Sequence, residues 1–225
     1  MHEFDSYAAK YKEILDQSLA FSGCTSEHFA EYKARYIARV AGLGEGCKVL
    51  DFGCGVGILS GLLHKHLPSA TLHGFDVSPE SIREIDVALL ACGFFTTNIA
   101  QLDCDYDLII LSNVLHHIQP TYRQATIFEL RKRLSPSGRL VIFEHNPVNP
   151  VTRWVVRQCP FDKGAVLLPL SETRSYLMCA GLCVVQQDYI IFSPRCTGWF
   201  YRFERFLARC PLGAQYVLVA RNSNE

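Results

Sequence analysis

The sequence predicts an α/β protein with a doubly wound, mostly parallel sheet of about seven strands. Short apolar runs alternate with helical patterns through the middle of the chain, and this alternation indicates βαβ units. The run at 107–112 is almost wholly apolar, as expected of a strand that is covered on both faces. At 46–57 an apolar run passes through an acid into three alternate glycines, which is typical of a strand-to-helix turn.

The expected elements follow in order. The predicted strands span residues 49–52, 70–75, 94–97, 107–112, 139–143, 182–192 and 215–221. The predicted helices span residues 58–66, 79–91, 121–134, 152–158 and 171–180. Ser78 is a good N-cap and Pro79 suits a first helical turn. The Ser-Pro-Ser-Gly stretch at 135–138 is a stop signal that should separate a helix from the next strand.

The chain of 225 residues is expected to form a single domain, 1–225, with three parts. Apolar residues at helical spacing between 3 and 41 predict a helical cap over 1–42. Residues 43–145 form the predicted ligand-binding core. Residues 146–225 form the predicted substrate side and the last two strands.

Composition excludes several classes of protein. Lys plus Arg and Asp plus Glu each number 22, so nucleic acid is not the expected main substrate, because its binders usually carry a basic excess. The N-terminus lacks a signal-peptide pattern, and no apolar run is long enough to span a membrane. A cytoplasmic location is therefore expected. Oligomeric state cannot be predicted.

Ten cysteines occur without any C-x-x-C pair. Cys179, Cys183 and Cys196 could conceivably share a metal, but they lack the spacing of paired ligands. Small buried hydrophobic side chains in a reducing compartment are the better interpretation. The sequence therefore predicts no metal site.

The glycine loop restricts the ligand. A dinucleotide fingerprint requires G-x-G-x-x-G, but Ile58 stands where the third glycine is needed, counting from Gly53. Asp51 would also repel a pyrophosphate. An NAD-dependent oxidoreductase is thus disfavoured, and a positively charged ligand without phosphate suits the loop. An ordinary glycine-rich turn is the alternative.

This loop resembles motif I of the class I S-adenosylmethionine-dependent methyltransferases, whose cofactor carries a sulfonium and an ammonium group. The resemblance covers residues 45–145 with motifs in order, and 171–221 by pattern only. It implies a Rossmann-like sheet that ends in an antiparallel C-terminal hairpin, with S-adenosyl-L-methionine as cofactor.

The resemblance also implies roles for single residues. The ribose hydroxyls would bind Asp76, an acid at the end of the second strand that could instead cap the next helix. Asn98 stands where the family usually carries an acid for the adenine amine, and Ile99 would pack on the purine. The expected cofactor-binding residues are Asp51, Gly53, Cys54, Gly55, Gly57, Asp76, Val77, Asn98, Ile99, Asn113 and the lid tyrosines Tyr7 and Tyr11, which could also simply pack.

Catalytic candidates follow the fourth and fifth strands. His117, the second of two adjacent histidines, is expected at the mouth of the site. Glu144 or His145 could act as general base, in a stretch to Asp162 interpreted as the substrate wall. Structural roles are the alternatives for all three. An amphipathic helix at 198–209 either packs on the domain or forms a lid over an apolar or lipid-linked acceptor.

The expected function is methyl transfer to a small-molecule or lipid- or sugar-linked metabolite, at oxygen. The rival from another class is a non-catalytic protein that binds S-adenosylmethionine as a partner or sensor. The Asn/Asp-Pro-Pro-Phe/Tyr tetrapeptide of amino methylation is missing, since Ser112-Asn113-Val114-Leu115 follows the fourth strand. That absence argues against N-methylation of bases or glutamine.

Overall fold

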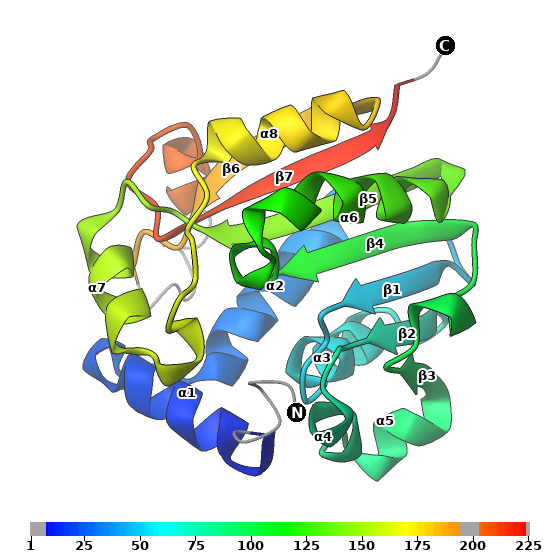
Figure 1. The fold of residues 1–225 in the computed structure, drawn as a ribbon, viewed down its shortest axis with the longest axis horizontal. Helices are drawn as coiled ribbons and strands as arrows, with labels where there is room; N and C mark the ends of the chain where they lie inside the picture. The colour runs from blue at the N-terminus through cyan, green and yellow to red at the C-terminus, as the bar shows by residue number, and fades with distance from the viewer. Residues whose placement is uncertain (1–7, 194–202, 224–225) are drawn as a thin grey trace.

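The computed structural model describes residues 8–193 and 203–223. Within these residues seven strands form one sheet in the order β3-β2-β1-β4-β5-β7-β6 (Figure 1). The strands are β1 (Lys48–Phe52), β2 (Thr71–Phe75), β3 (Gly93–Thr96), β4 (Tyr106–Ser112), β5 (Leu134–His145), β6 (Leu182–Ile190) and β7 (Gln215–Asn222). The first five strands pair in parallel, while β7 pairs antiparallel with both β5 and β6. The predicted fold class is confirmed, including the antiparallel C-terminal pair.

Helices cover both faces of the sheet. The α-helices named in the described parts of the chain are α1 (Tyr11–Leu19), α2 (Ser26–Val40), α3 (Ile58–His66), α4 (Pro79–Arg83), α5 (Val87–Cys92), α6 (Pro120–Lys132), α7 (Pro150–Gln158) and α8 (Leu170–Cys179). Alternate residues of β4 serve the two faces: Leu108 and Ile110 pack in the layer that contains α2, α3 and α5, whereas Ile109 and Leu111 pack in the layer of α6 and α8. A strand buried on both sides must be apolar throughout, as β4 is.

The topology creates a crevice at one edge of the sheet. The chain winds outward from β1 to β2 and β3 on one side, and β4 and β5 lie on the other. Ligands of such sheets bind beyond the carboxyl ends of the strands at this reversal. Figure 1 shows α1 and α7 beyond the arrowheads of β1 and β4, so the N-terminal cap and the segment after β5 both face the crevice.

Two predicted boundaries were wrong. The helix expected at 79–91 is divided into α4 and α5, because the Asp86 side chain accepts the Ala88 N–H at 2.7 Å and caps a new helix. Residues 135–138 belong to β5 instead of a turn. The ladder between β4 and β5 is irregular there, and a Cβ on Gly138 would lie 2.5 Å from the Tyr106 carbonyl oxygen, so the close approach needs glycine.

The predicted helix at 198–209 lies partly outside the described residues. In the remainder a short helical stretch begins at Phe203 and continues as a 3₁₀ turn, Arg205–Leu207. Phe206 there is 83% exposed, so it does not pack on the domain. No helix in the described parts of the chain is long and apolar enough to cross a membrane.

Candidate active site

A cavity of about 950 Å³ occupies the crevice. Its walls come from the cap helices, the ends of β1, β2, β4 and β5, and α7. The lining includes nearly all predicted site residues that the structure describes: Tyr11, Asp51, Gly53, Cys54, Gly55, Asp76, Val77, Asn98, Ile99, Asn113, His117 and His145. The volume lies at the upper end of the usual range for small-molecule sites, so it can hold more than one reactant.

The glycine loop is held in left-handed backbone conformations. Gly53, Gly55 and Gly57 have φ of 83°, 54° and 79°, a region that residues with a Cβ rarely adopt. The N–H groups of Gly53 and Cys54 donate to the Phe75 carbonyl at 2.7 and 3.0 Å, which ties the loop to β2. Gly57 is the N-cap of α3 and is the one predicted glycine that does not line the cavity.

Two acidic residues line the cavity beside the glycine loop. Asp51 is buried and accepts the Ser60 hydroxyl at 2.6 Å; burial raises its pKa to about 6. Asp76 accepts the Gly55 N–H at 2.8 Å and the Ser78 N–H at 2.9 Å. Ser78, not Asp76, is the N-cap of α4, as its sequence position predicted. Two carboxylates beside an open glycine loop suit a cationic ligand that has no phosphate.

Asparagines complete this end of the cavity. The Asn98 side chain accepts the Ala100 N–H at 3.0 Å and so caps the 3₁₀ turn Ile99–Gln101. Asn113 has a φ of 60°, and its buried Oδ1 has no hydrogen-bond partner. A ligand with a hydrogen-bond donor would satisfy that oxygen. These residues fit the ammonium-bearing cofactor that the glycine loop predicts.

Of the two tyrosines predicted as a lid, the structure describes only Tyr11. Tyr7 lies outside the described residues. Tyr11 stacks on Phe161, with ring centroids 4.7 Å apart and an interplanar angle of 17°. This contact joins α1 to the segment after α7, on the substrate side of the cavity.

Lys33 is a site residue that the sequence interpretation missed. It projects from α2 and donates to the Ser112 hydroxyl at 2.8 Å, and only 5% of its surface is exposed. Burial lowers its pKa to about 8, against the pull of Glu144 and Asp51. The sequence did indicate its burial: Lys33 lies four residues after Phe29 and four before Ile37, and this spacing puts it on the apolar face of the helix.

Glu144 stands behind the cavity wall instead of in it. Its Oε1 accepts the N–H groups of Val114 and Leu115 at 3.1 and 2.7 Å, and its Oε2 lies 2.6 Å from His116 Nδ1. The residue is fully buried. Its carboxylate therefore holds the turn after β4, and it is not placed to meet a substrate.

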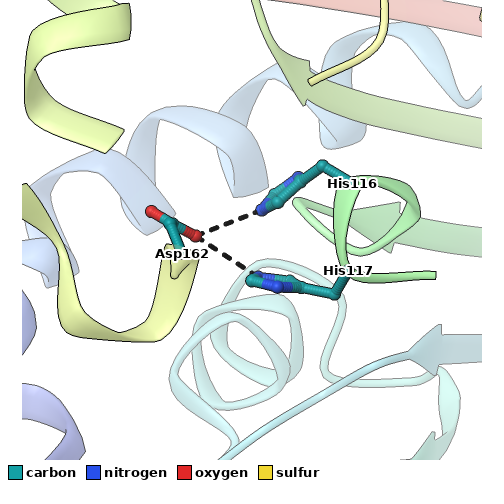
Figure 2. Close-up of side chains that lie close together, drawn as sticks. All are labelled: His116, His117 and Asp162. Carbon is teal, nitrogen blue, oxygen red and sulfur yellow. Dashed lines mark ion pairs between the residues drawn. The ribbon is translucent and has the colours of Figure 1, made fainter. Parts of the chain in front are cut away.

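Three side chains converge on the cavity next to that turn. Figure 2 shows His116 and His117 pointing at Asp162, which comes from the segment after α7. Each histidine Nε2 lies 3.4 Å from Asp162 Oδ1. The sequence placed Asp162 in the predicted substrate wall and favoured His117 over His116, but it did not predict that the three side chains meet. Asp162 is separated from the histidines by more than one element, so no local motif reveals the contact.

The protonation states of the three histidines differ. Burial opposes the charged form of His116, but the carboxylates of Glu144 and Asp162 outweigh it and raise its pKa to about 9. Burial, then the neighbouring His116 cation, lowers the pKa of His117 to about 4 and that of His145 to about 3. At neutral pH the cavity thus presents two neutral imidazoles, which are weak bases and can accept hydrogen bonds through their lone pairs.

Comparisons with known proteins find similarity to methyltransferases. A methyltransferase domain family model matches residues 50–140. Malonyl-[acyl-carrier protein] O-methyltransferase of Herminiimonas arsenicoxydans is 34% identical over 131 residues, 55% of this chain and 49% of the relative. Trans-aconitate 2-methyltransferase of an Enterobacter species is 29% identical over 58% of this chain and 52% of the relative. The chain thus spans about half the length of the curated relatives it matches.

A solved structure shares the fold over almost the whole chain. Magnesium protoporphyrin IX methyltransferase from Synechocystis PCC 6803, with bound S-adenosylhomocysteine, has a TM-score of 0.67 at 18% identity and covers 97% of both chains. At that identity the likeness concerns the fold alone.

Proposed function

Since the chain belongs to the class I S-adenosylmethionine-dependent methyltransferases, we propose that it transfers the methyl group of S-adenosylmethionine to an oxygen of a small apolar or carrier-linked metabolite. One observation carries the proposal: a single cavity brings the acidic glycine loop together with the neutral imidazoles of His117 and His145. The glycine loop would bind a cation, and the imidazoles could accept a hydrogen bond from the acceptor.

The cofactor end is formed by the loop and its acids. Asp76 is the residue to hold the ribose, as its place at the end of β2 suggests, and Asp51 and Asn113 would face the cationic methionine part. When bound, S-adenosylmethionine supplies a methyl group on a sulfonium, which is a good leaving group. The protein must then hold the acceptor in line, exclude water and remove a proton.

The acceptor end has an apolar wall and a polar corner. Leu15, Leu19, Phe29, Val151 and Val155 line it together with the stacked pair Tyr11 and Phe161. The polar corner holds His117, His145 and Asp162. An acceptor with an apolar body and one hydroxyl or carboxyl group fits this division. The O-methyltransferase among the relatives, which acts on a malonyl group of an acyl-carrier protein by its name, supports oxygen as the target.

Of the three predicted catalytic candidates, His117 and His145 are placed to contact the acceptor. Both line the cavity and are neutral at pH 7, and their low pKa values favour accepting a hydrogen bond from the acceptor over removing its proton. Glu144 is better assigned as a positioning residue, because its oxygens already bind His116 and two backbone N–H groups.

Titration calorimetry tests the cofactor first. Wild-type protein should bind S-adenosylmethionine and S-adenosylhomocysteine but not NADH. Asp76→Asn should weaken binding of both by about 10- to 100-fold, the value of one or two hydrogen bonds to a charged group. Asp105→Asn is the matched control, since Asp105 is exposed with a φ of 61° at the opposite end of β4. Absence of binding in the wild type would refute the proposed function.

Turnover separates the enzyme from its rival. The wild type should release S-adenosylhomocysteine in the presence of a panel of small hydroxy and carboxylic acids, and His145→Gln should slow release without changing the affinity for S-adenosylmethionine. Cofactor binding with no turnover on any acceptor would favour a non-catalytic partner or sensor.

A further inference from the structure

We propose that His116, His117 and Asp162 form a binding site for a divalent transition-metal ion such as Zn²⁺. This departs from the sequence, which predicted no metal site. The binding of the ion does not depend on the proposed methyl transfer; only its chemical use there does.

The three donors already lie close to ligating positions. The relevant nitrogen and oxygen atoms are all within 4.8 Å of one another, and both Nε2–Oδ1 distances are 3.4 Å. Zinc bonds of about 2.0–2.2 Å keep tetrahedral ligand atoms roughly 3.5 Å apart. Small side-chain rotations would therefore bring the donors onto an ion.

The tautomer of His116 is set for coordination. Its Nδ1 lies 2.6 Å from Glu144 Oε2, and Glu144 is itself fixed by the N–H groups of Val114 and Leu115. With Nδ1–H donated to the carboxylate, Nε2 is the nitrogen that points into the cluster and would coordinate the ion once deprotonated. That Nε2 is buried and has no hydrogen-bond partner, while His116 as a whole is 2% exposed. A carboxylate behind a histidine is the usual outer shell of a metal ligand.

The negative charge around His116 favours a bound cation. Glu144 and Asp162 place two carboxylates around one buried imidazole. A divalent ion bound by the two histidines would offset both carboxylates.

The donor set selects the kind of metal. Two imidazole nitrogens and one carboxylate suit Zn²⁺, Co²⁺ or Fe²⁺, whereas Mg²⁺ and Ca²⁺ take oxygen ligands. Three protein ligands leave a position open, as in catalytic sites. That position would face the cavity, since His117 and Asp162 line it. An oxygen of the acceptor could occupy it.

Direct metal binding tests the proposal. Protein treated with a chelator and dialysed is titrated with Zn²⁺ by calorimetry, and with Co²⁺ by its visible absorption. One Zn²⁺ per chain should bind to the wild type. Asp162→Asn and His117→Gln should each weaken binding by more than about 100-fold, because even outer-shell changes cost 10- to 100-fold. His66→Gln, which removes a histidine 3.0 Å from a carboxylate on the surface, should bind as the wild type does.

The outcomes distinguish the two proposals. Circular dichroism checks folding of each variant, and His117→Gln serves if Asp162→Asn does not fold, since the His117 side chain is 23% exposed. Zn²⁺ binding that is absent, or equal in wild type and both ligand variants, overturns the metal site. S-adenosylmethionine titrated into the same metal-free samples reports on the proposed function separately, because none of the proposed cofactor contacts is altered.

Discussion

Glu144 Oε2 lies 2.6 Å from His116 Nδ1 in a fully buried contact between the end of β5 and the turn after β4. The same carboxylate accepts two backbone N–H groups of that turn. One side chain therefore sets the path of the chain and the orientation of the imidazole that faces Asp162. The polar corner of the cavity depends on a residue that does not line it.

Glu144→Gln should lower the free energy of unfolding by about 1–3 kcal/mol, the cost of leaving a buried polar group poorly matched. The glutamine oxygen can still accept the backbone N–H groups, but its amide replaces the charged acceptor of His116. Urea denaturation at pH 7 measures the change. The affinity for S-adenosylmethionine should stay as in the wild type, because Glu144 is not part of the cavity wall.

Glu84→Gln is the control for that substitution. Glu84 is exposed at the end of α4, so its charge can be removed with little effect on folding. If both variants lost the same free energy of unfolding, the buried Glu144 contact would contribute no more to stability than an exposed carboxylate does. If Glu144→Gln abolished cofactor binding while it remained folded, its placement outside the cofactor site would be wrong.

Gly55 and Gly46 offer a matched pair for the glycine loop. Both have left-handed backbone, with φ of 54° and 70°, and neither would bring an added Cβ within 4 Å of another protein atom. Alanine at either position should cost about 1–2 kcal/mol of stability through backbone strain. Of these two glycines, only Gly55 lines the cavity.

Gly55→Ala should therefore weaken S-adenosylmethionine binding at least tenfold, while Gly46→Ala should leave it unchanged. Calorimetric affinities, read beside urea denaturation of the same samples, separate strain from steric exclusion. Equal affinities in the two variants would mean that the cofactor does not approach the backbone at Gly55.

The predictions from sequence succeeded where the chemistry is contiguous. The predicted fold class is confirmed by the structure, and a methyltransferase domain family model matches residues 50–140. The glycine loop is a local motif: strand, turn and helix follow one another within 46–66. The end of β2 closes it, because Phe75 accepts from Gly53 and Cys54 and Asp76 accepts the Gly55 N–H. Residues that bind through nearby backbone can be identified without knowing the tertiary fold.

The acceptor end could not be predicted in this way. Lys33 reaches Ser112 only after α2 packs on the sheet, and His116 meets Asp162 only after the segment after α7 returns to the turn after β4. Glu144 illustrates the same limit. Its position at the end of the fifth strand indicated a catalytic role, but its carboxylate binds the backbone at Val114 and Leu115.

Lys33 provides a test in which stability and function oppose each other. Its pKa falls from 10.5 in an ordinary lysine to about 8 in the folded chain, because burial disfavours the charge. Below pH 8 the lysine is protonated in both the folded and the unfolded chain, so the free energy of unfolding is reduced by the full cost of burying the charge. Between pH 8 and 10.5 the unfolded chain alone holds the proton, so stability rises with pH across that window.

Lys33→Met should thus be more stable than the wild type at pH 7, by about 2–3 kcal/mol, given about 1.4 kcal/mol for each pKa unit less the lost bond to Ser112. The difference should shrink as pH rises from 8 toward 10. Urea denaturation at pH 7, 8.5 and 9.5 follows it, with Lys65→Met, an exposed change on α3, as control. A Lys33→Met variant less stable than the wild type at pH 7 would mean that the ammonium stabilises the fold through Asp51 and Glu144. If the variant is instead stabilised but turns over more slowly, Lys33 is retained for its action in the cavity at the expense of stability.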